Sequence, residues 1–362
     1  MLTAVTGTNW GDEGKGRIVD LLSEHADYVV RYQGGNNAGH TVVTDKGKFV
    51  LNLLPSGILH PEVVCVLGNG MVIDPDHLRH EIEMMRYMNV KISPENLKIS
   101  EKATVCMPFH VRQDVLEEER LSKTGEAFGS TKRGIAYAYG DKYMKKTLRM
   151  GDLLYLDSEV IKKRIAMIVE SKNLILEKVY GQKTLSVEEV MDWCRGQAEF
   201  LKPYITDTGA LLEQAASRDK NILFEAQLGA LRDIDYGIYP YTSSSSTIAA
   251  YATIGAGIPK RQPDRVVGVM KAYSTCVGEG PFVAEKAAGE EWNEKLRKAG
   301  NEFGAATGRP RRVGPFDAVA SRYGLQCQNA GDIALTKLDV LSCFEKIPVI
   351  MGYRVNGKLI TD

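Results

Sequence analysis

The amino-terminal segment of the sequence places a strand, a glycine-rich loop and a helix directly after one another. The apolar run Leu2–Thr6 leads into the loop Gly7–Arg17, and a helix-like pattern starts at Ile18. In such an arrangement, backbone N–H groups and the positive end of a helix meet a phosphate, and glycines let the main chain approach it closely. We therefore predict an α/β fold with a phosphate site in this loop.

Two charged residues of the loop indicate a catalytic or phosphate-binding role. Lys15 adds a point charge that suits a phosphate, whereas Asp12 repels one unless a metal ion lies between them or the carboxylate takes a proton. The Walker A pattern needs a glycine five residues before its Gly-Lys pair and a Ser or Thr after it, but Asn9 and Gly16 stand at these positions. The loop is P-loop-like without being a standard P-loop.

The composition predicts a globular enzyme and excludes several other classes of protein. The 362 residues carry no formal net charge and are 44% hydrophobic, which argues against a nucleic-acid-binding protein. No signal peptide and no run of about 18 apolar residues is present, so we expect a cytoplasmic location and no membrane contact. The six cysteines are scattered, which favours free thiols. Without a linker, residues 1–362 are expected to form a single domain with a helical insertion at 155–215.

A second glycine- and amide-rich loop follows the next predicted strand. Tyr28–Tyr32 reads as a strand and continues into Gln33–Thr41. Two such loops close together in the sequence suggest one composite site. A single histidine is usually a surface or core residue, but His40 lies between Gly39 and Thr41, and this setting favours a functional role.

The remaining pattern predicts a large, mostly parallel central sheet with helices on both faces. On the helix that begins at Pro75, we expect Glu81, Glu83 and Arg86 to form a solvated face. Further strands are predicted at Phe49–Leu54, Val63–Leu67, Ile222–Glu225, Val266–Met270 and Ile333–Asp339, and further helices over Val111–Leu121 and within Asp157–Gln214.

Two clusters of hydroxyl-bearing residues have open interpretations. Gly129–Gly134 joins glycines, hydroxyls and cations, which suits a second phosphate, although a plain surface loop has a similar composition. Thr242–Thr247 carries a hydroxyl on each residue ahead of the helix-like Ile248–Tyr251. These hydroxyls can cap that helix or bind an anion at its N-terminus.

Two charged clusters near the end of the chain indicate ligands. Arg309, Arg311 and Arg312 repel one another unless an anion holds them, so a dicarboxylate or a nucleotide is the interpretation we favour over a solvated loop. The strand at Ile333 ends in Lys-x-Asp, which resembles the guanine-reading motif of GTP-binding proteins. A strand end with two charges is also common in other proteins.

Taken together, these motifs resemble the adenylosuccinate synthetase family, ligases that join IMP and L-aspartate at the expense of GTP. The resemblance covers nearly the whole chain. It rests on motifs that occur in the family's order at Trp10–Gly16, Asn36–Thr41, Asp233–Asp235, Lys271–Thr275, Thr307–Arg309 and Thr336–Asp339. It implies that Mg²⁺ is the cofactor, that GTP is the co-substrate and that the product serves AMP biosynthesis. The γ-phosphoryl group would pass to O6 of IMP, and the amine of aspartate would then displace phosphate at C6.

The resemblance also implies roles for individual residues. Asp12 would be the base that takes the N1 proton and, with the Gly39 carbonyl, a ligand of Mg²⁺. His40 would stabilise the oxyanion on O6, and Gln227 is the candidate for the purine-facing catalytic glutamine. The implied GTP-binding residues are Gly11, Glu13, Gly14, Lys15, Gly16, Arg17, Gly39, Thr41, Arg311, Lys337, Leu338 and Asp339. The implied IMP-binding residues are Asn37, Ala38, Thr131, Lys145, Ser243 and Arg309, and the implied aspartate-binding residues are Ala306, Thr307, Gly308, Arg309 and Arg311.

Several departures from the family pattern fall on the acceptor site. The family's Gly-Ile-Gly-Pro is Gly134–Tyr137 here, and Ser243 stands where a threonine is usual. Lys145 replaces the arginine that reaches the IMP phosphate from the neighbouring subunit of a homodimer. Phe224–Gly229 replaces Phe-Glu-Gly-Ala-Gln-Gly, so the glutamine is displaced by one place. The sequence also ends before the family's C-terminal segment, which completes the guanine pocket, so we expect a reduced preference for GTP over ATP.

Two alternatives to an IMP ligase remain open from the sequence. One is the same chemistry on another purine nucleotide, such as GMP or dGMP. The other is a catalytically idle paralogue that binds nucleotide. The retained Asp12, Lys15 and His40 speak against an idle protein, because a binding module has no need of a base.

Overall fold

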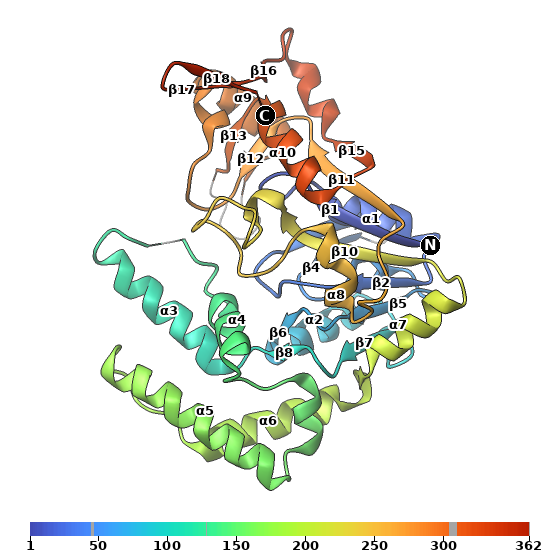
Figure 1. Cartoon of the computed structure of the whole chain (residues 1–362), viewed down its shortest axis with the longest axis vertical. Helices are drawn as coiled ribbons and strands as arrows, with labels where there is room; N and C mark the ends of the chain where they lie inside the picture. Colours follow the sequence, from blue (N-terminus) through green and yellow to red (C-terminus); the bar gives the residue numbers. More distant parts are fainter. Residues whose placement is uncertain (45–46, 128, 304–309, 362) are drawn as a thin grey trace.

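The computed structural model describes residues 1–44, 47–127, 129–303 and 310–361. Within these residues the framework is an eight-stranded sheet in the order β15-β11-β1-β10-β2-β5-β7-β9 (Figure 1). All its pairings are parallel, which confirms the predicted central sheet. Its strands are β1 (Leu2–Gly7), β2 (Tyr28–Arg31), β5 (Val64–Leu67), β7 (Leu97–Ser100), β9 (Ile205–Thr206), β10 (Ile222–Gly229), β11 (Arg265–Lys271) and β15 (Asp332–Thr336).

Helices cover both faces of this sheet. Val29 and Val30 are neighbours on β2, yet they belong to two different hydrophobic clusters, as do Leu223 and Phe224 on β10. Alternate strand residues point to opposite faces, so both faces are buried, as a parallel sheet requires. The helices are α1 (Lys15–Ser23), α2 (Pro75–Tyr87), α3 (Pro108–Ser122), α4 (Ile135–Met144), α5 (Glu159–Lys178), α6 (Val187–Leu201), α7 (Thr208–Ser217), α8 (Ala252–Ala256), α9 (Glu290–Gly300) and α10 (Ala318–Gln328).

Helices α3 to α6 lie together at one end of the molecule, below the sheet in Figure 1. The pair α5 and α6 falls within the segment in which a helical insertion is predicted, and Ile161, Ile165 and Ile168 of α5 are buried as one stripe. In the residues that the structure describes, no helix combines the length and apolar character needed to span a membrane. The cysteines are free thiols, as predicted.

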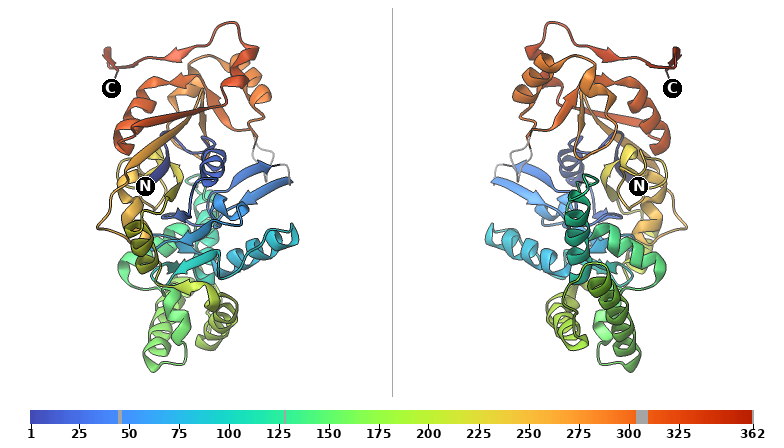
Figure 2. Two further views of the ribbon diagram at one scale, coloured as in Figure 1. Left: turned by 90° about the vertical axis from the view of Figure 1, so that its right-hand side faces the viewer. Right: turned by 90° about the vertical axis from the view of Figure 1, so that its left-hand side faces the viewer.

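Short strand pairs form separate two-stranded sheets outside the main sheet. The hairpin β3–β4 projects from the same side of the molecule as α2 (Figure 2). These pairs are β3 (His40–Thr44) with β4 (Gly47–Leu51), β6 (Val72–Ile73) with β8 (Thr104–Val105), β12 (Ser274–Cys276) with β13 (Arg312–Gly314), β14 (Phe316–Asp317) with β16 (Val349–Ile350), and β17 (Tyr353–Val355) with β18 (Lys358–Ile360).

The structure corrects two predictions that concern Glu81. This side chain is only 5% exposed, so it does not belong to a solvated face. Its carboxylate accepts the backbone N–H groups of Asn52, Leu53 and Leu54 at 2.7, 2.9 and 3.2 Å. Because these N–H groups bond to Glu81, the strand predicted at Phe49–Leu54 ends at Leu51. Burial raises the pKa of Glu81, against the effect of these hydrogen bonds.

Candidate active site

The predicted motifs follow the carboxyl ends of neighbouring strands. The first loop follows β1, the second follows β2, and Gln227 lies at the end of β10. Lys271 ends β11, and the Lys-x-Asp motif follows β15. Because these strands are parallel and adjacent, their ends meet at one edge of the sheet, where α/β proteins bind their ligands.

The first loop is shaped by left-handed backbone and by Glu13. Gly11, Asp12 and Gly14 have φ values of 97°, 58° and 90°, and Gly14 is the N-cap of α1. The buried carboxylate of Glu13 accepts the N–H groups of Asn9 and Gly11 at 3.1 and 2.9 Å. The Lys15 ammonium lies 2.5 Å from the same carboxylate. The side chain of Glu13 therefore fixes the conformation of the loop by bonding to its backbone and to Lys15.

The second loop packs directly against the start of α1. A Cβ atom at Gly16 would lie 2.5 Å from the His40 ring, so only glycine lets the two loops meet. His40 Nε2 lies 2.8 Å from Ser56 Oγ and 3.3 Å from the buried Glu225 carboxylate. Burial lowers the pKa of His40, although the Glu225 charge opposes this shift. A histidine favoured as functional thus lies beside the phosphate loop.

Gln227 holds the second loop in place. Its amide nitrogen donates to the carbonyls of Gly35 and Ala38 at 2.9 and 3.0 Å, and its oxygen accepts from Gly35 N at 3.1 Å. The register between β1 and β10 shifts at this point, and the next residue, Leu228, has a φ of 62°. The irregular backbone accommodates the displaced glutamine. Its amide is bonded to the backbone of the second loop.

The hydroxyl-rich run connects to this loop. Ser243 Oγ lies 3.0 Å from Ser245 Oγ, and Ser245 donates to the Gln33 side chain at 3.0 Å. The helix predicted at Ile248–Tyr251 is instead the 3-10 turn η5 (Ala249–Tyr251) followed by the five-residue α8. The backbone N–H of Thr247 donates to the Asp233 carboxylate, and this hydrogen bond fixes the carboxyl-terminal end of the run.

Arg311 connects the first loop to the arginine cluster. Its guanidinium lies 3.4 Å from the Asp12 carboxylate and donates at 2.8 Å to Glu302, which is 1% exposed. Glu302 also accepts from Lys271 at 2.8 Å and from the Tyr273 hydroxyl at 2.6 Å. The predicted aspartate-binding residues Ala306, Thr307, Gly308 and Arg309 lie outside the described residues.

The Lys-x-Asp motif also reaches the first loop. The Thr336 hydroxyl donates to the backbone oxygen of Glu13 at 2.6 Å, which ties the end of β15 to the phosphate loop. The predicted strand ends at Thr336, because Lys337 adopts a left-handed φ of 60° and the 3-10 turn η7 (Leu338–Cys343) follows. Lys337, Leu338 and Asp339, which follow the strand, are exposed.

Three other predicted residues, Arg17, Thr131 and Lys145, are exposed, and Asn37 lies within the second loop. The Arg17 side chain is 65% exposed and pairs with Asp20 of its own helix. Lys145 is exposed at the carboxyl end of α4, and Thr131 is exposed on the loop before α4. Asn37 accepts from Gly35 N at 3.3 Å within the second loop.

Sequence reasoning assigned no site role to the buried Glu225, Lys271 and Glu302. Glu225 had a visible signal, because a carboxylate inside the apolar run Ile222–Glu225 must find partners when the strand is buried. Lys271 similarly ends a buried strand. Nothing around Glu302 in the sequence marks it, since its partners come from distant segments.

The donor set fits a magnesium ion held mainly by phosphates. Among the residues that the structure describes, no group of three or more His, Cys, Asp or Glu side chains is placed to bind a metal. A half-buried carboxylate at Asp12 and a backbone carbonyl at Gly39 are oxygen ligands of the kind Mg²⁺ uses when phosphates supply the rest.

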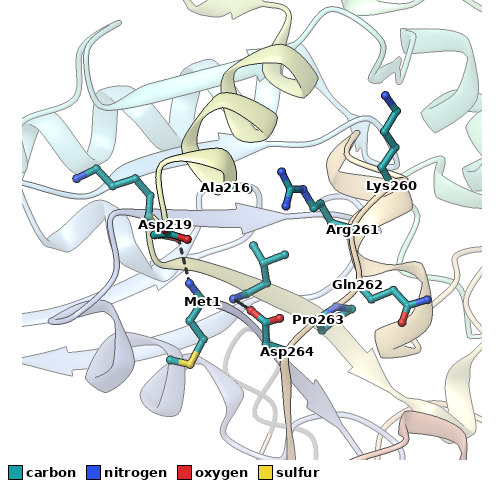
Figure 3. Close-up of a pocket in the computed structure, with 10 residues that line it drawn as sticks. Met1, Ala216, Asp219, Lys260, Arg261, Gln262, Pro263 and Asp264 are labelled. Carbon is teal, nitrogen blue, oxygen red and sulfur yellow. Dashed lines mark hydrogen bonds between the residues drawn. The ribbon is translucent and has the colours of Figure 1, made fainter.

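One cavity lies away from these motifs. Its volume is about 440 Å³, and it is lined by Met1, Lys220, Arg261 and Asp264, among others (Figure 3). The cavity therefore lies at the amino ends of the sheet strands, opposite the loops that follow their carboxyl ends. A cavity of about 10 Å³ beside Gly11 and Lys271 borders the first loop.

Comparison with known proteins decides the family. The model of the family described as adenylosuccinate synthetase matches residues 4–362. The chain belongs to the adenylosuccinate synthetase family. An adenylosuccinate synthetase from Caldanaerobacter subterraneus subsp. tengcongensis is 46% identical over 361 residues, which are 100% of this chain and 83% of the relative. Another, from Carboxydothermus hydrogenoformans, is 49% identical over 356 residues, 98% of this chain and 82% of the relative.

The fold of this chain also matches solved structures. A fully ligated adenylosuccinate synthetase from Plasmodium falciparum has a TM-score of 0.89 and 35% identity, and the match covers 99% of this chain and 82% of that one. A succinoaminodeoxyadenylate synthetase of cyanophage S-2L has a TM-score of 0.63 at 20% identity and shares the fold. It covers 98% of this chain and 93% of the phage chain.

Family membership establishes the reaction. The protein is a GTP- and Mg²⁺-dependent C–N ligase that joins IMP and L-aspartate to give adenylosuccinate. A different purine acceptor is not favoured, because relatives at 45–49% identity are adenylosuccinate synthetases. A homodimer is typical of this family.

Proposed function

We propose that Asp12 is the base of this ligation and that the two loops at the start of the chain form the phosphoryl-transfer site. The observation that carries the proposal is the position of the Asp12 carboxylate at the N-terminus of α1, half-buried and 3.4 Å from Arg311. A carboxylate here can take the N1 proton of IMP while the α1 N-terminus receives phosphate oxygens. Asp12 and the Gly39 carbonyl would hold Mg²⁺ together with the phosphates, and the ion would there supply neutralisation of the charge that develops in phosphoryl transfer.

His40 is proposed to stabilise the oxyanion on O6 of IMP. Glu225 and Ser56 fix its ring through Nε2, and the ring lies on the first turn of α1. The lowered pKa keeps the imidazole neutral until an anion arrives beside it, and a phosphoryl group at that place favours the charged ring. The ring is therefore positioned before substrate binds, as electrostatic stabilisation requires.

Arg311 is proposed to bind the dicarboxylate substrate. Its Nε is buried and has no hydrogen-bond partner among the described residues, so one donor of the fork is available. Glu302 fixes the other side of the guanidinium. A guanidinium held in this way can pair with a carboxylate of aspartate, next to the base.

The exposed loop that contains Thr131 is proposed to hold the 5′-phosphate of IMP, with Lys145 of the second subunit of a homodimer crossing to the same place. Both side chains are exposed, and a lysine neutralises a phosphate as a point charge. We further propose that the chain forms one domain and acts in the cytoplasm, where free cysteines such as these persist.

The test is phosphate release from GTP in the presence of aspartate and one acceptor at a time. IMP should support turnover, whereas GMP, dGMP and dIMP should support much less. Equal turnover with GMP would overturn the assignment of the acceptor site, and release without aspartate consumption would overturn the assigned amine step.

A further inference from the structure

Two buried carboxylates on α3 lie beneath the loop that precedes α4. Asp114 and Glu118 are 6% and 9% exposed and stand one helical turn apart, so they share one face of α3. Asp114 accepts from the Ser130 hydroxyl at 2.6 Å and from Gly134 N at 2.8 Å. Glu118 accepts from the N–H groups of Gly129 and Ser130 at 2.7 and 3.1 Å. These bonds fix both ends of the loop from below.

The same loop presents its cations and a hydroxyl outward. Thr131, Lys132 and Arg133 are all exposed, and Lys132 adopts a left-handed φ of 57°. Its N–H bonds to the Ser130 hydroxyl at 3.1 Å, so Ser130 connects the Asp114 carboxylate to the strained part of the loop. A Cβ atom at Gly134 would lie 2.6 Å from Val111 N, which shows how closely the loop rests on α3. The outward side chains therefore depend on the carboxylates beneath them for their direction.

Helix α3 is itself firmly anchored. His110 Nε2 lies 2.8 Å from Asp141 of α4, and Lys172 of α5 lies 2.6 Å from the same carboxylate. All of these side chains are buried. Asp114 thus lies on a helix that buried polar contacts connect to α4 and, through Asp141, to α5.

We infer that Asp114 is a positioning residue that pre-forms the loop Gly129–Gly134 for the 5′-phosphate of the acceptor nucleotide. This inference rests on the proposed placement of that phosphate at Thr131. Asp114 does not touch the nucleotide; it supplies two charge-assisted acceptors that keep the loop in its binding shape. Without these two acceptors, the loop must become ordered when the nucleotide binds. This cost weakens binding of the nucleotide but leaves the rate of the chemical step unchanged.

The test compares the kinetic constants of Asp114→Asn with those of Ser130→Ala, Thr131→Ala and the control Glu119→Gln. Glu119 is an exposed acid on the same helix. Asp114→Asn should raise KM for IMP about tenfold, the effect of losing a hydrogen bond to a charged group, with little change in kcat or in KM for GTP and aspartate. Ser130→Ala should shift KM for IMP in the same direction and Glu119→Gln should not. Should Asp114→Asn fail to fold, Ser130→Ala decides, because it removes an Asp114 contact and leaves α3 unchanged.

The outcomes separate the inference from the proposed site. If Thr131→Ala raises KM for IMP and the Asp114 and Ser130 variants do not, the positioning role is wrong and the phosphate site stands. If none of the three changes KM for IMP, the phosphate site is misplaced and the inference fails with it. Equal rises in KM for IMP, GTP and aspartate would show a structural role alone and would also overturn the inference.

Discussion

The Asp12 carboxylate lies 3.4 Å from the Arg311 guanidinium, although the two residues come from opposite ends of the chain. The other side of the guanidinium is fixed by Glu302, which is buried. The proposed base and the proposed ligand of the amino acid are therefore neighbours before any substrate binds. With the proposed roles, this contact would bring the amine and the purine to one place.

Arg311→Lys is expected to weaken binding of aspartate. Lysine keeps the charge but cannot bond Glu302 and a carboxylate with one planar fork, so KM for aspartate should rise at least about tenfold, more than KM for GTP or IMP. Steady-state kinetics with each substrate varied in turn gives these values. Arg312→Lys is the matched control, because Arg312 pairs with Glu285 at 2.7 Å. A change confined to the GTP dependence would show that the arginine was assigned to the wrong ligand.

Gln227→Glu is expected to loosen the second loop. The amide donates to two backbone carbonyls, and a carboxylate in its place would repel them. KM for IMP should rise, and amide hydrogen exchange over residues 34–38 should become faster. The exposed Gln182→Glu serves as the control. Unchanged exchange in a folded Gln227→Glu protein contradicts the assigned role.

Asp339→Asn is expected to erode the preference for GTP over ATP. A carboxylate accepts from N1–H and the 2-amino group of guanine. Adenine has an unprotonated N1 and no 2-amino group, so it offers neither of these donors. Because Asp339 is exposed, the substitution should leave the melting temperature unchanged. The ratio of kcat/KM for the two nucleotides provides the readout, and an unaltered ratio would place the guanine site elsewhere.

The free energy of unfolding should fall in mild acid because His110 is buried. Burial lowers its pKa below the ordinary value of 6.5, against the effect of Asp141. The unfolded chain then binds more protons than the folded chain, so the stabilisation is complete above pH 6.5 and is lost as the pH falls toward the folded pKa. The slope is about 1.4 kcal/mol per pH unit for one proton.

Urea unfolding between pH 7.5 and 5 measures this effect. His110→Gln should give a shallower dependence on pH than the wild type, whereas the exposed His25→Gln should follow the wild type. Burial also lowers the pKa of His40 and His77, so some acid dependence should persist in every variant. Identical slopes for His110→Gln and the wild type would exclude the contribution of His110.

The sequence was sufficient where local chemistry decides structure. The strand, glycine loop and helix from Leu2 to Ser23 were predictable, because their glycines and apolar spacing act over a few residues. The prediction for Glu81 was wrong because backbone N–H groups distant in the sequence donate to its carboxylate. The contacts of Gln227 with the second loop were not predictable for the same reason. Glu302 was assigned no site role for the same reason. Contacts of this kind depend on the tertiary fold, which periodicity does not encode.

The most direct test of the account is the turnover of Asp12→Asn in phosphate release from GTP with IMP and aspartate. Asparagine keeps the size of the side chain but cannot accept the N1 proton, so kcat should fall at least about 100-fold while the melting temperature stays near that of the wild type. Near-normal turnover in this variant would contradict the role of Asp12 as the base.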